Sequence, residues 1–200
     1  MYRTKGFAVL VLAVGATVSG AAQAGDTGEV IPRAEVAINY SYMRANAAPG
    51  NCGCFNLNGG GAEIAFRAWR SFSAVFDLTG AHAGTTSIPG QSLSLVSYTG
   101  GPRFSYPLHR GGRARMIPFV QGLFGAAHGF DGQFPTHSGT LASSATSFAL
   151  LAGGGLDLEF KHRVAVRVAQ VDYGLDQLPN NATNSENLLR VSAGVVLRLR

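Results

Sequence analysis

The sequence predicts an all-β fold, an eight-stranded antiparallel up-and-down transmembrane β-barrel, from three observations. Apolar and polar residues alternate along eight segments, and alternate side chains of a strand point to opposite faces. Charged residues make up 14% of the chain, well below the roughly 25% typical of soluble domains. After the first residues, no apolar run is long enough for a spanning helix. This combination favours strands whose apolar face meets lipid.

The first segment, residues 1–24, is expected to be a cleaved signal peptide. Arg3 and Lys5 give it a positive start, a short apolar stretch follows, and Ala22-Gln23-Ala24 has the small-x-small pattern of a cleavage site. Cleavage between Ala24 and Gly25 leaves residues 25–200 as one β-barrel domain of an exported protein.

The eight strands are expected at 33–44, 62–70, 72–81, 93–106, 115–127, 147–160, 163–173 and 188–200. The last one, LLRVSAGVVLRLR, shows the pattern most clearly. One face carries Leu189, Val191, Ala193, Val195, Leu197 and Leu199, and the other carries Arg190, Arg198 and Arg200. In a membrane barrel the apolar face points to lipid and the polar face points to the lumen.

The other strands follow the same alternation with two irregularities. The outward residues of the first four strands are expected to be Val36, Ile38, Tyr40, Tyr42, Ile64, Phe66, Phe72, Phe76, Leu78, Tyr98, Phe104 and Tyr106. Trp69 is assigned to the inward face by the same count. The fifth strand has no clear phase, because its apolar residues do not alternate cleanly. The seventh loses its alternation after Ala169, which indicates a β-bulge.

The connections are expected to alternate in length. Short turns follow the second, fourth and sixth strands, and long loops lie at 45–61, 83–92, 128–146 and 174–187. This polarity is typical of outer-membrane barrels, which have short periplasmic turns and longer extracellular loops. The loops are rich in Gly, Asn, Ser, Thr and Pro, the residues of turns and surface segments.

The inward faces are expected to carry a network of arginine–carboxylate pairs. An eight-stranded barrel is just wide enough for side chains to fill it, and an unpaired buried charge is costly. The candidates are Glu35, Glu63, Arg67, Asp77, Arg103, Asp157, Glu159, Arg163, Arg167, Arg190 and Arg198. Such a network either plugs the barrel or lines a narrow, gated ion path.

No catalytic, cofactor-binding or metal site is expected. Cys52 and Cys54 in the first loop form either a strained disulfide or free thiols. The histidines match no metal-binding spacing, and Gly153-Gly154-Gly155 lies inside a strand, so it is no phosphate loop. The basic residues form no aromatic-interleaved patch, so no nucleic-acid partner is expected.

The signal, the eight strands, the glycine-rich stretches YTGGPRF at 98–104 and IPFVQG at 117–122, and the amphipathic last strand together resemble the OmpA-like family of small eight-stranded outer-membrane β-barrels. The resemblance covers residues 25–200. It implies a protein of a Gram-negative-type outer membrane, without enzymatic activity, with a structural or surface-interaction role through its loops. The expected partners are outer-membrane lipid, lipopolysaccharide and an extracellular partner. We expect a monomer.

Two other functions remain open from the sequence. A small, gated, porin-like pore would use the polar lumen for conduction. A soluble periplasmic barrel that binds an apolar ligand, as lipocalins do, would require the apolar residues to face inward.

Overall fold

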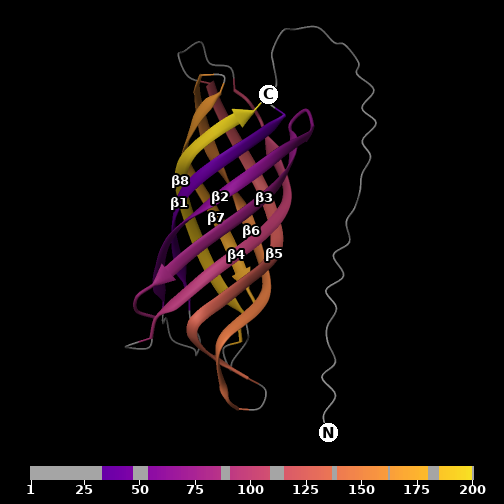
Figure 1. The fold of residues 1–200 in the computed structure, drawn as a ribbon. Helices are drawn as coiled ribbons and strands as arrows, with labels where there is room; N and C mark the ends of the chain where they lie inside the picture. The colour runs from indigo at the N-terminus through magenta and orange to yellow at the C-terminus, as the bar shows by residue number, and fades with distance from the viewer. Residues whose placement is uncertain are drawn as a thin grey trace. The chain divides into compact units, whose positions relative to one another are not determined.

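The computed structural model describes residues 33–46, 54–86, 91–108, 115–136, 139–161, 163–179 and 185–199. They form a closed barrel of eight antiparallel strands in chain order (Figure 1). The strands are β1 Ala34–Ala45, β2 Phe55–Trp69, β3 Phe72–Ala83, β4 Leu93–Ser105, β5 Arg115–Pro135, β6 Leu141–Lys161, β7 Val164–Asp176 and β8 Glu186–Leu199. The fold class expected from the sequence is therefore confirmed. Within the described residues, no helix is long and apolar enough to cross a membrane.

The barrel closes between the first and the last strand. β1 pairs with β8 along its whole length, from Ala34 opposite Leu199 to Ala45 opposite Leu188. Closure satisfies backbone groups that an open sheet would leave unpaired at its edge. Because all backbone groups are paired within the barrel, its strands can lie in lipid with their apolar faces turned outward.

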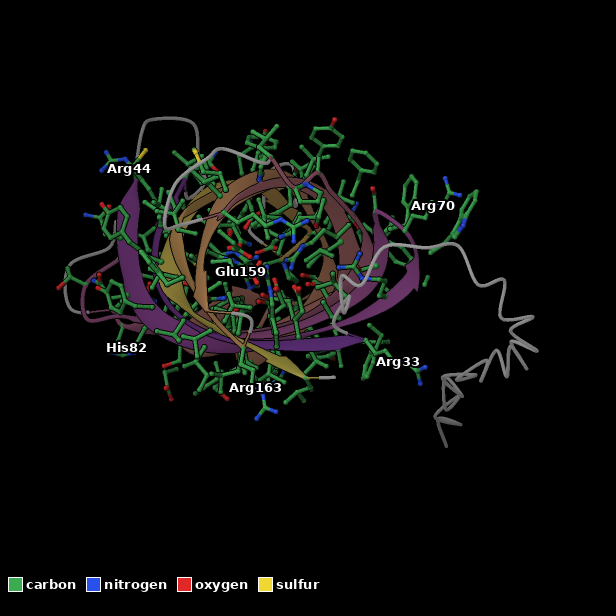
Figure 2. All side chains as sticks on the ribbon, turned by 90° about the horizontal axis from the view of Figure 1, so that it is seen from above. Arg33, Arg44, Arg70, His82, Glu159 and Arg163 are labelled. Atoms are coloured by element: carbon green, nitrogen blue, oxygen red, sulfur yellow. The ribbon has the colours of Figure 1, made fainter. Side chains whose placement is uncertain are left out.

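The apolar side chains of the strands face outward. Ile38, Phe76 and Val120 are 65%, 62% and 59% exposed, while Ala37, Val75 and Phe119 beside them are buried. Figure 2, a view from above, shows side chains filling the interior, and its labelled Arg33, Arg44, Arg70, His82 and Arg163 lie on the outside. A soluble ligand-binding barrel would require these apolar side chains to face inward, whereas in the described strands they face outward.

The two ends of the barrel differ. We call the end where β2–β3, β4–β5 and β6–β7 connect the turn end, and the opposite end the loop end. Several predicted loops prove to be strand. β2 begins at Phe55 rather than at residue 62, β5 continues to Pro135 rather than 127, and β6 begins at Leu141 rather than 147. The glycine- and serine-rich composition of these segments suggested loops, but ladder pairing holds them as strands.

The β5–β6 hairpin extends past the rest of the barrel (Figure 1). β5 pairs with β4 only as far as Phe130, and β6 pairs with β7 only from Ala149 onward. Beyond these residues the two strands pair only with each other, through a bulge between Phe130 and Phe134. The predicted long loop is therefore largely a projecting β-ribbon.

Two side-chain directions expected from the sequence were wrong. A register shift between Arg67 and Trp69 turns Trp69 outward, where it is 69% exposed, so its inward assignment was wrong. Arg163 was also assigned inward, but it lies exposed in the turn before β7. The bulge expected near Ala169 is confirmed by a register shift between Arg167 and Gln170.

Candidate functional site: the barrel lumen and its mouth

The centre of the lumen is organised around Glu63 of β2. Arg103 of β4 and Arg167 of β7 each bind one of its carboxylate oxygens, at 2.5 Å and 2.9 Å. Arg167 also contacts Asp157 of β6 through two nitrogens, at 2.8 Å and 3.3 Å. Both guanidinium groups lie over the ring of Phe119, at 4.3 Å and 4.6 Å from its centroid. Each buried charge thus has an opposite partner, and the arginines also have an aromatic face.

Two glutamines extend this centre toward β8. Gln121 accepts from Arg103 Nε at 3.0 Å and donates to Asp172 Oδ1 at 3.1 Å. Gln170 accepts from Arg167 at 2.8 Å and donates to Asp172 Oδ2 at 2.7 Å. Amides serve this purpose because each one both accepts and donates.

Arg190 of β8 completes the network. It binds Asp172 Oδ2 through Nη2 at 2.9 Å and Asp77 Oδ1 of β3 through Nη1 at 2.8 Å. Thr79 accepts from the same Nη1 at 3.1 Å and donates to Asp77 at 3.0 Å. The resulting set joins β2 through β8, and we call it the central network. Its members are Glu63, Asp77, Thr79, Arg103, Gln121, Asp157, Arg167, Gln170, Asp172 and Arg190.

A second ionic cluster lies nearer the turn end. Arg198 is 3.0 Å from Glu35 Oε1 and also pairs with Glu159, which Figure 2 labels inside the barrel. This cluster connects β1, β6 and β8. The guanidinium of Arg67 donates to the backbone carbonyl of Arg70 in the β2–β3 turn.

The structure thus brings most of the sequence-predicted lumen residues into two clusters. Four central members, Thr79, Gln121, Gln170 and Asp172, were absent from the predicted charge set. Thr79 carries no charge, Gln121 lies in the strand without a clear phase, and Gln170 and Asp172 follow the bulge at Val168 and Ala169. Skipping one residue at the bulge restores the alternation and would have placed both inward.

An apolar layer separates the central network from the loop end. It is formed by buried side chains near the loop ends of the strands, including Leu57, Leu95, Leu123, Leu151 and Leu188. Phe134 of the projecting hairpin joins this layer, and Gly129 and Gly132 leave room for its ring. The interior therefore changes from ionic to apolar along the barrel axis.

Two carboxyl groups lie at the mouth, above this layer. Asp176 and Glu186 are opposite each other, at the end of β7 and the start of β8. They lie beyond the roughly 9–11 residues per strand that span a bilayer. Burial raises the pKa of Asp176 to about 6, against a smaller opposing effect of Arg190. Burial and the neighbouring Asp176 raise the pKa of Glu186 to about 7.

On the outside of the loop end, His82, Ser94 and Asp131 form a hydrogen-bonded chain. Ser94 Oγ donates to Asp131 Oδ2 at 3.0 Å, and His82 Nδ1 lies 3.0 Å from the same hydroxyl. The single hydroxyl proton is directed to the aspartate, so the histidine donates here. A nucleophilic serine requires the reverse, with histidine accepting the proton. The chain instead joins β3 and β4 to the projecting hairpin.

Several sequence predictions lie outside the described residues. The cleavage site at Ala24 and Gly25 is one, and Cys52 is another, so the pairing of Cys52 with Cys54 stays a prediction. In the part of the chain that the structure describes, no group of three or more His, Cys, Asp or Glu side chains is placed to hold a metal ion.

Comparisons with solved structures show the same fold. Neisserial surface protein A matches with a TM-score of 0.61 and 16% identity, over 83% of this chain and 97% of that one. Ail, the attachment invasion locus protein of Yersinia pestis, matches with a TM-score of 0.53 and 16% identity, over the same shares, in a complex with the heparin analogue sucrose octasulfate. A scan of protein-family models and a search of curated proteins give no match. The resemblance to small outer-membrane barrels is therefore confirmed for the fold.

Proposed function

We propose that this chain, with the fold of small eight-stranded outer-membrane barrels, is a non-enzymatic surface protein of a Gram-negative-type outer membrane. Its lumen is plugged, and its loop end contacts an extracellular partner. One observation carries the proposal: side chains fill the interior while the β5–β6 hairpin extends beyond it. The surface available to a partner is then the outside of the loop end rather than a channel.

The outward-facing surface of the strands supports a location in the outer membrane. Its exposed aliphatic and aromatic side chains form a band that water would solvate poorly and lipid would cover. We propose that the chain is exported by its signal peptide and then cleaved between Ala24 and Gly25, and that phospholipid and lipopolysaccharide surround the band. The loop end then faces the medium and the turn end faces the periplasm.

Two layers that follow each other along the barrel axis, the central network and the apolar layer, support a plugged lumen. The central network pairs its buried charges, and the apolar layer above it offers no polar path for an ion. The small gated pore has no comparable observation in its favour. Silent planar bilayers are expected for the purified protein, and reproducible single-channel steps altered by Arg167→Gln would contradict the plug.

The projecting hairpin is the element we propose for partner contact. From Leu141 to Ser147, β6 has no strand beside it on the side away from β5 among the described residues. An unpaired strand edge can bind an extended segment of another protein through backbone hydrogen bonds. The exposed Ser143, Ser144 and Thr146 along this edge have short side chains that would not hinder such an approach.

The charge of the loop end constrains the partner. Segments 45–62, 80–97, 126–149 and 174–189 contain no lysine or arginine, and Arg44 is the nearest basic residue to them on β1. Ail has been solved with a sulfated sugar. Multiply sulfated ligands need clustered cations, so we propose a neutral or weakly basic protein partner for this chain. Sucrose octasulfate is therefore expected to bind poorly at the loop end.

The test compares bacteria that display the full chain with bacteria that display a shortened hairpin, in which Asn-Gly joins Ala127 to Ser147. Adhesion to immobilised host matrix proteins is expected to fall with the shortened hairpin. A full-length hairpin with residues 141–147 scrambled is the matched control for hairpin length. A heat-dependent gel shift of each variant in the outer-membrane fraction checks folding and location. Adhesion that is equal in all three strains would sink the proposed role of the hairpin.

A further inference from the structure

Three arginines lie on the outside of the turn end. Arg33 precedes β1, Arg70 lies in the β2–β3 turn and Arg163 lies in the turn before β7, and all three side chains are exposed. Figure 2 labels each of them outside the barrel wall. We call Arg33, Arg70 and Arg163 the arginine arc. They belong neither to the central network nor to the cluster around Arg198.

Backbone hydrogen bonds place two members of the arc on either side of β8. The carbonyl oxygen of Arg163 accepts from the backbone N–H of Arg198 at 2.9 Å, and the backbone N–H of Arg33 donates to the carbonyl oxygen of Leu199 at 3.1 Å. Because adjacent strands lie about 4.8 Å apart, the backbones of Arg163 and Arg33 are roughly 10 Å apart.

The arc continues from Arg33 to Arg70. The carbonyl oxygen of Arg33 accepts from the backbone N–H of Arg67 on β2 at 3.0 Å, and the guanidinium of Arg67 donates to the carbonyl oxygen of Arg70. Arg70 has a φ of 38°, in a region that residues with a Cβ rarely adopt, so this hydrogen bond helps to hold the turn that presents Arg70. The arc therefore forms one rim from the β6–β7 turn over β8 and β1 to the β2–β3 turn.

The carboxylates of the turn end do not neutralise this rim. Glu35, Asp157 and Glu159 lie inside the barrel, where Glu35 and Glu159 bind Arg198 and Asp157 binds Arg167. On the outside, the described residues of this end contribute arginines and no carboxylate. The outer surface of the turn end is therefore positively charged.

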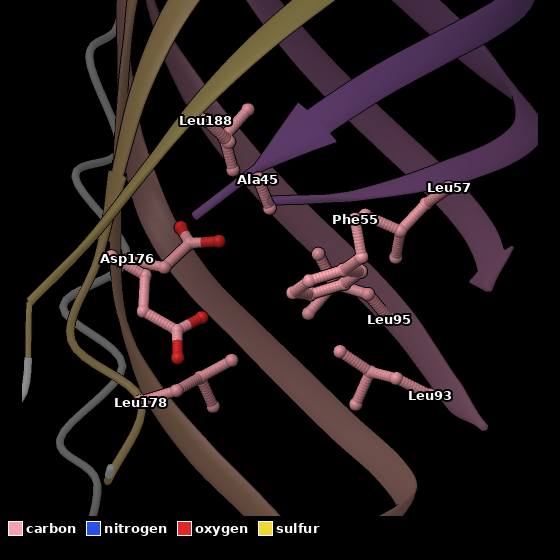
Figure 3. A pocket seen from close by; sticks show the side chains of 9 residues that line it. Ala45, Phe55, Leu57, Leu93, Leu95, Asp176, Leu178 and Leu188 are labelled. Carbon is pink, nitrogen blue, oxygen red and sulfur yellow. The ribbon is translucent and has the colours of Figure 1, made fainter. Parts of the chain in front are cut away.

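The loop end has the opposite balance of charge. Asp176 and Glu186 lie in a small apolar pocket at the mouth, where Figure 3 shows Asp176 near Leu178 and Leu188. Arg44 is the only exposed arginine among the described residues of that end. A membrane that surrounds the barrel thus meets concentrated positive charge at one of its two surfaces.

Exposed aromatic side chains indicate the depth of the arc in that membrane. Trp69, beside Arg70, is 69% exposed, and Phe160, three residues before Arg163, is 56% exposed. Aromatic side chains of membrane barrels gather where the hydrocarbon meets the headgroups. The arginines next to them are therefore at the depth of the headgroup phosphates.

We propose that the arginine arc binds the phosphate groups of anionic phospholipids, such as phosphatidylglycerol, in the periplasmic leaflet. This inference rests on the outer-membrane location and the orientation proposed above, and it adds the class of lipid and the residues that select it. The planar guanidinium fork donates to two phosphate oxygens at once and stays charged at physiological pH. A zwitterionic headgroup has the same phosphate but carries its own cation, so it gains less from the arc.

The experiment uses Trp69, the single tryptophan of the chain, as a reporter of the lipid beside Arg70. The folded protein is placed in vesicles of phosphatidylcholine and phosphatidylglycerol, with a quenching, brominated acyl chain on one lipid or the other. Phosphatidylglycerol is expected to bind beside Trp69 roughly fivefold more strongly than phosphatidylcholine at low salt, the effect of about one arginine near an anionic surface. Salt should reduce the preference because it screens exposed charges.

Removing the arc is expected to remove the preference. Arg33→Gln, Arg70→Gln and Arg163→Gln together should bring the ratio of the two binding constants close to one. Arg44→Gln, which removes an exposed arginine at the loop end, is the matched control and should leave the ratio unchanged. A heat-dependent gel shift checks that each variant is folded.

A second reporter tests the far end of the arc. Trp69→Phe combined with Phe160→Trp moves the tryptophan beside Arg163, and there Arg163→Gln is expected to lower the preference more than Arg70→Gln does. Equal quenching by the two brominated lipids, or a preference that survives the triple variant, would overturn the proposal and leave the membrane location standing. A folded barrel that neither lipid quenches would overturn both.

Discussion

Arg190 connects strands that are not neighbours in the barrel. Its guanidinium joins β8 to Asp172 on β7 and to Asp77 on β3, across the interior of the barrel. Side chains that bridge strands far apart in sequence fix the width of the barrel as well as its charge balance. The consequences of removing Arg190 are therefore expected to exceed those of removing an exposed arginine.

Arg190→Met is expected to lower the free energy of unfolding by about 3–5 kcal/mol, because it leaves Asp77 and Asp172 without their cation. Urea-induced unfolding in lipid vesicles measures this change. Arg163→Met, at an exposed turn residue, is the control and should change stability by less than about 0.5 kcal/mol. Adding Asp77→Asn and Asp172→Asn to Arg190→Met should recover part of the loss. No recovery would mean that packing rather than charge pairing is lost.

The acidic pair at the mouth predicts a pH dependence of stability. Folding raises the pKa of Asp176 from 3.8 to about 6 and that of Glu186 from 4.5 to about 7. The folded state therefore binds protons more tightly than the unfolded state. The free energy of unfolding contributed by this pair falls as the pH rises through this range, and the penalty is complete above about pH 7.

Asp176→Asn is accordingly expected to stabilise the barrel by about 1–3 kcal/mol at about pH 8 and to have little effect at about pH 4. Unfolding in urea at a series of pH values measures the difference between the variant and the natural chain. Asp131→Asn provides the control for removing an exposed acid. A stabilisation that is independent of pH would contradict the titration of Asp176 as its cause.

For single residues, the sequence predicts which face of a strand a side chain occupies better than it predicts which residue that side chain binds. Alternation places Glu63, Asp77, Arg103 and Arg190 inward because the period of a strand is a local property. It does not say that Glu63 lies between Arg103 and Arg167, which are 40 and 104 residues away in the chain. Only the register of the strands in the closed barrel brings these residues together.

Among the elements, the seam between β1 and β8 determines whether the barrel closes. Gly194 of β8 lies opposite Asn39 of β1. An added Cβ would lie 2.1 Å from the carbonyl oxygen of Ile38 and 2.9 Å from the Cα of Asn39. Because these atoms belong to the backbone, the strands themselves would have to move apart.

Gly194→Ala is therefore expected to weaken closure, by about 1–3 kcal/mol for a local overpacking. The measurement is the temperature at which the folded gel band converts to the unfolded band. Gly122→Ala is the matched control, because no atom lies within 4 Å of a Cβ added there. Equal effects of the two alanines would show that loss of glycine in a strand, rather than contact at the seam, is responsible.

The projecting hairpin is attached to the barrel wall by Ser94. Ser94→Ala removes the hydroxyl between His82 and Asp131 and leaves the backbone unchanged. Amide exchange in residues 131–136 and 139–145 is expected to accelerate, while exchange in the barrel wall stays the same. Ser97→Ala on the same strand is the control, because Ser97 contacts Thr79 and not the hairpin. Unchanged exchange in Ser94→Ala would mean that the β5–β6 ladder and the packing of Phe134 fix the hairpin without Ser94.

The limits of sequence reasoning are clearest in β5 and β6. Composition at 128–146 suggested a mobile loop, because glycine, serine and threonine are frequent in loops. Hydrogen bonds between the strands hold much of this segment as a ladder, with a bulge at Asp131, whose φ is 61°. A segment with the composition of a loop can form a strand when a neighbouring strand supplies the hydrogen-bond partners of its backbone.

For the whole molecule, the asymmetry of the two ends predicts an orientation in the membrane. An epitope inserted in the connection 136–140 is expected to bind antibody on intact cells. The same epitope inserted between Arg70 and Ser71 should bind only after the outer membrane is permeabilised. Immunofluorescence on intact and permeabilised cells makes the measurement, and a periplasmic protein provides the control for integrity. The reverse pattern would invert the proposed orientation.

The sequence by itself determined the fold class, the number and order of the strands, and the apolar face, because each follows from a two-residue period within one strand. Only the tertiary structure decided the phase after each bulge, the length of the β5–β6 hairpin and the members of the central network. It alone placed Asp176 and Glu186 together in an apolar pocket. The physical reason is register: which side chains meet across the lumen depends on how eight strands are aligned when the barrel closes, and no single strand encodes that alignment.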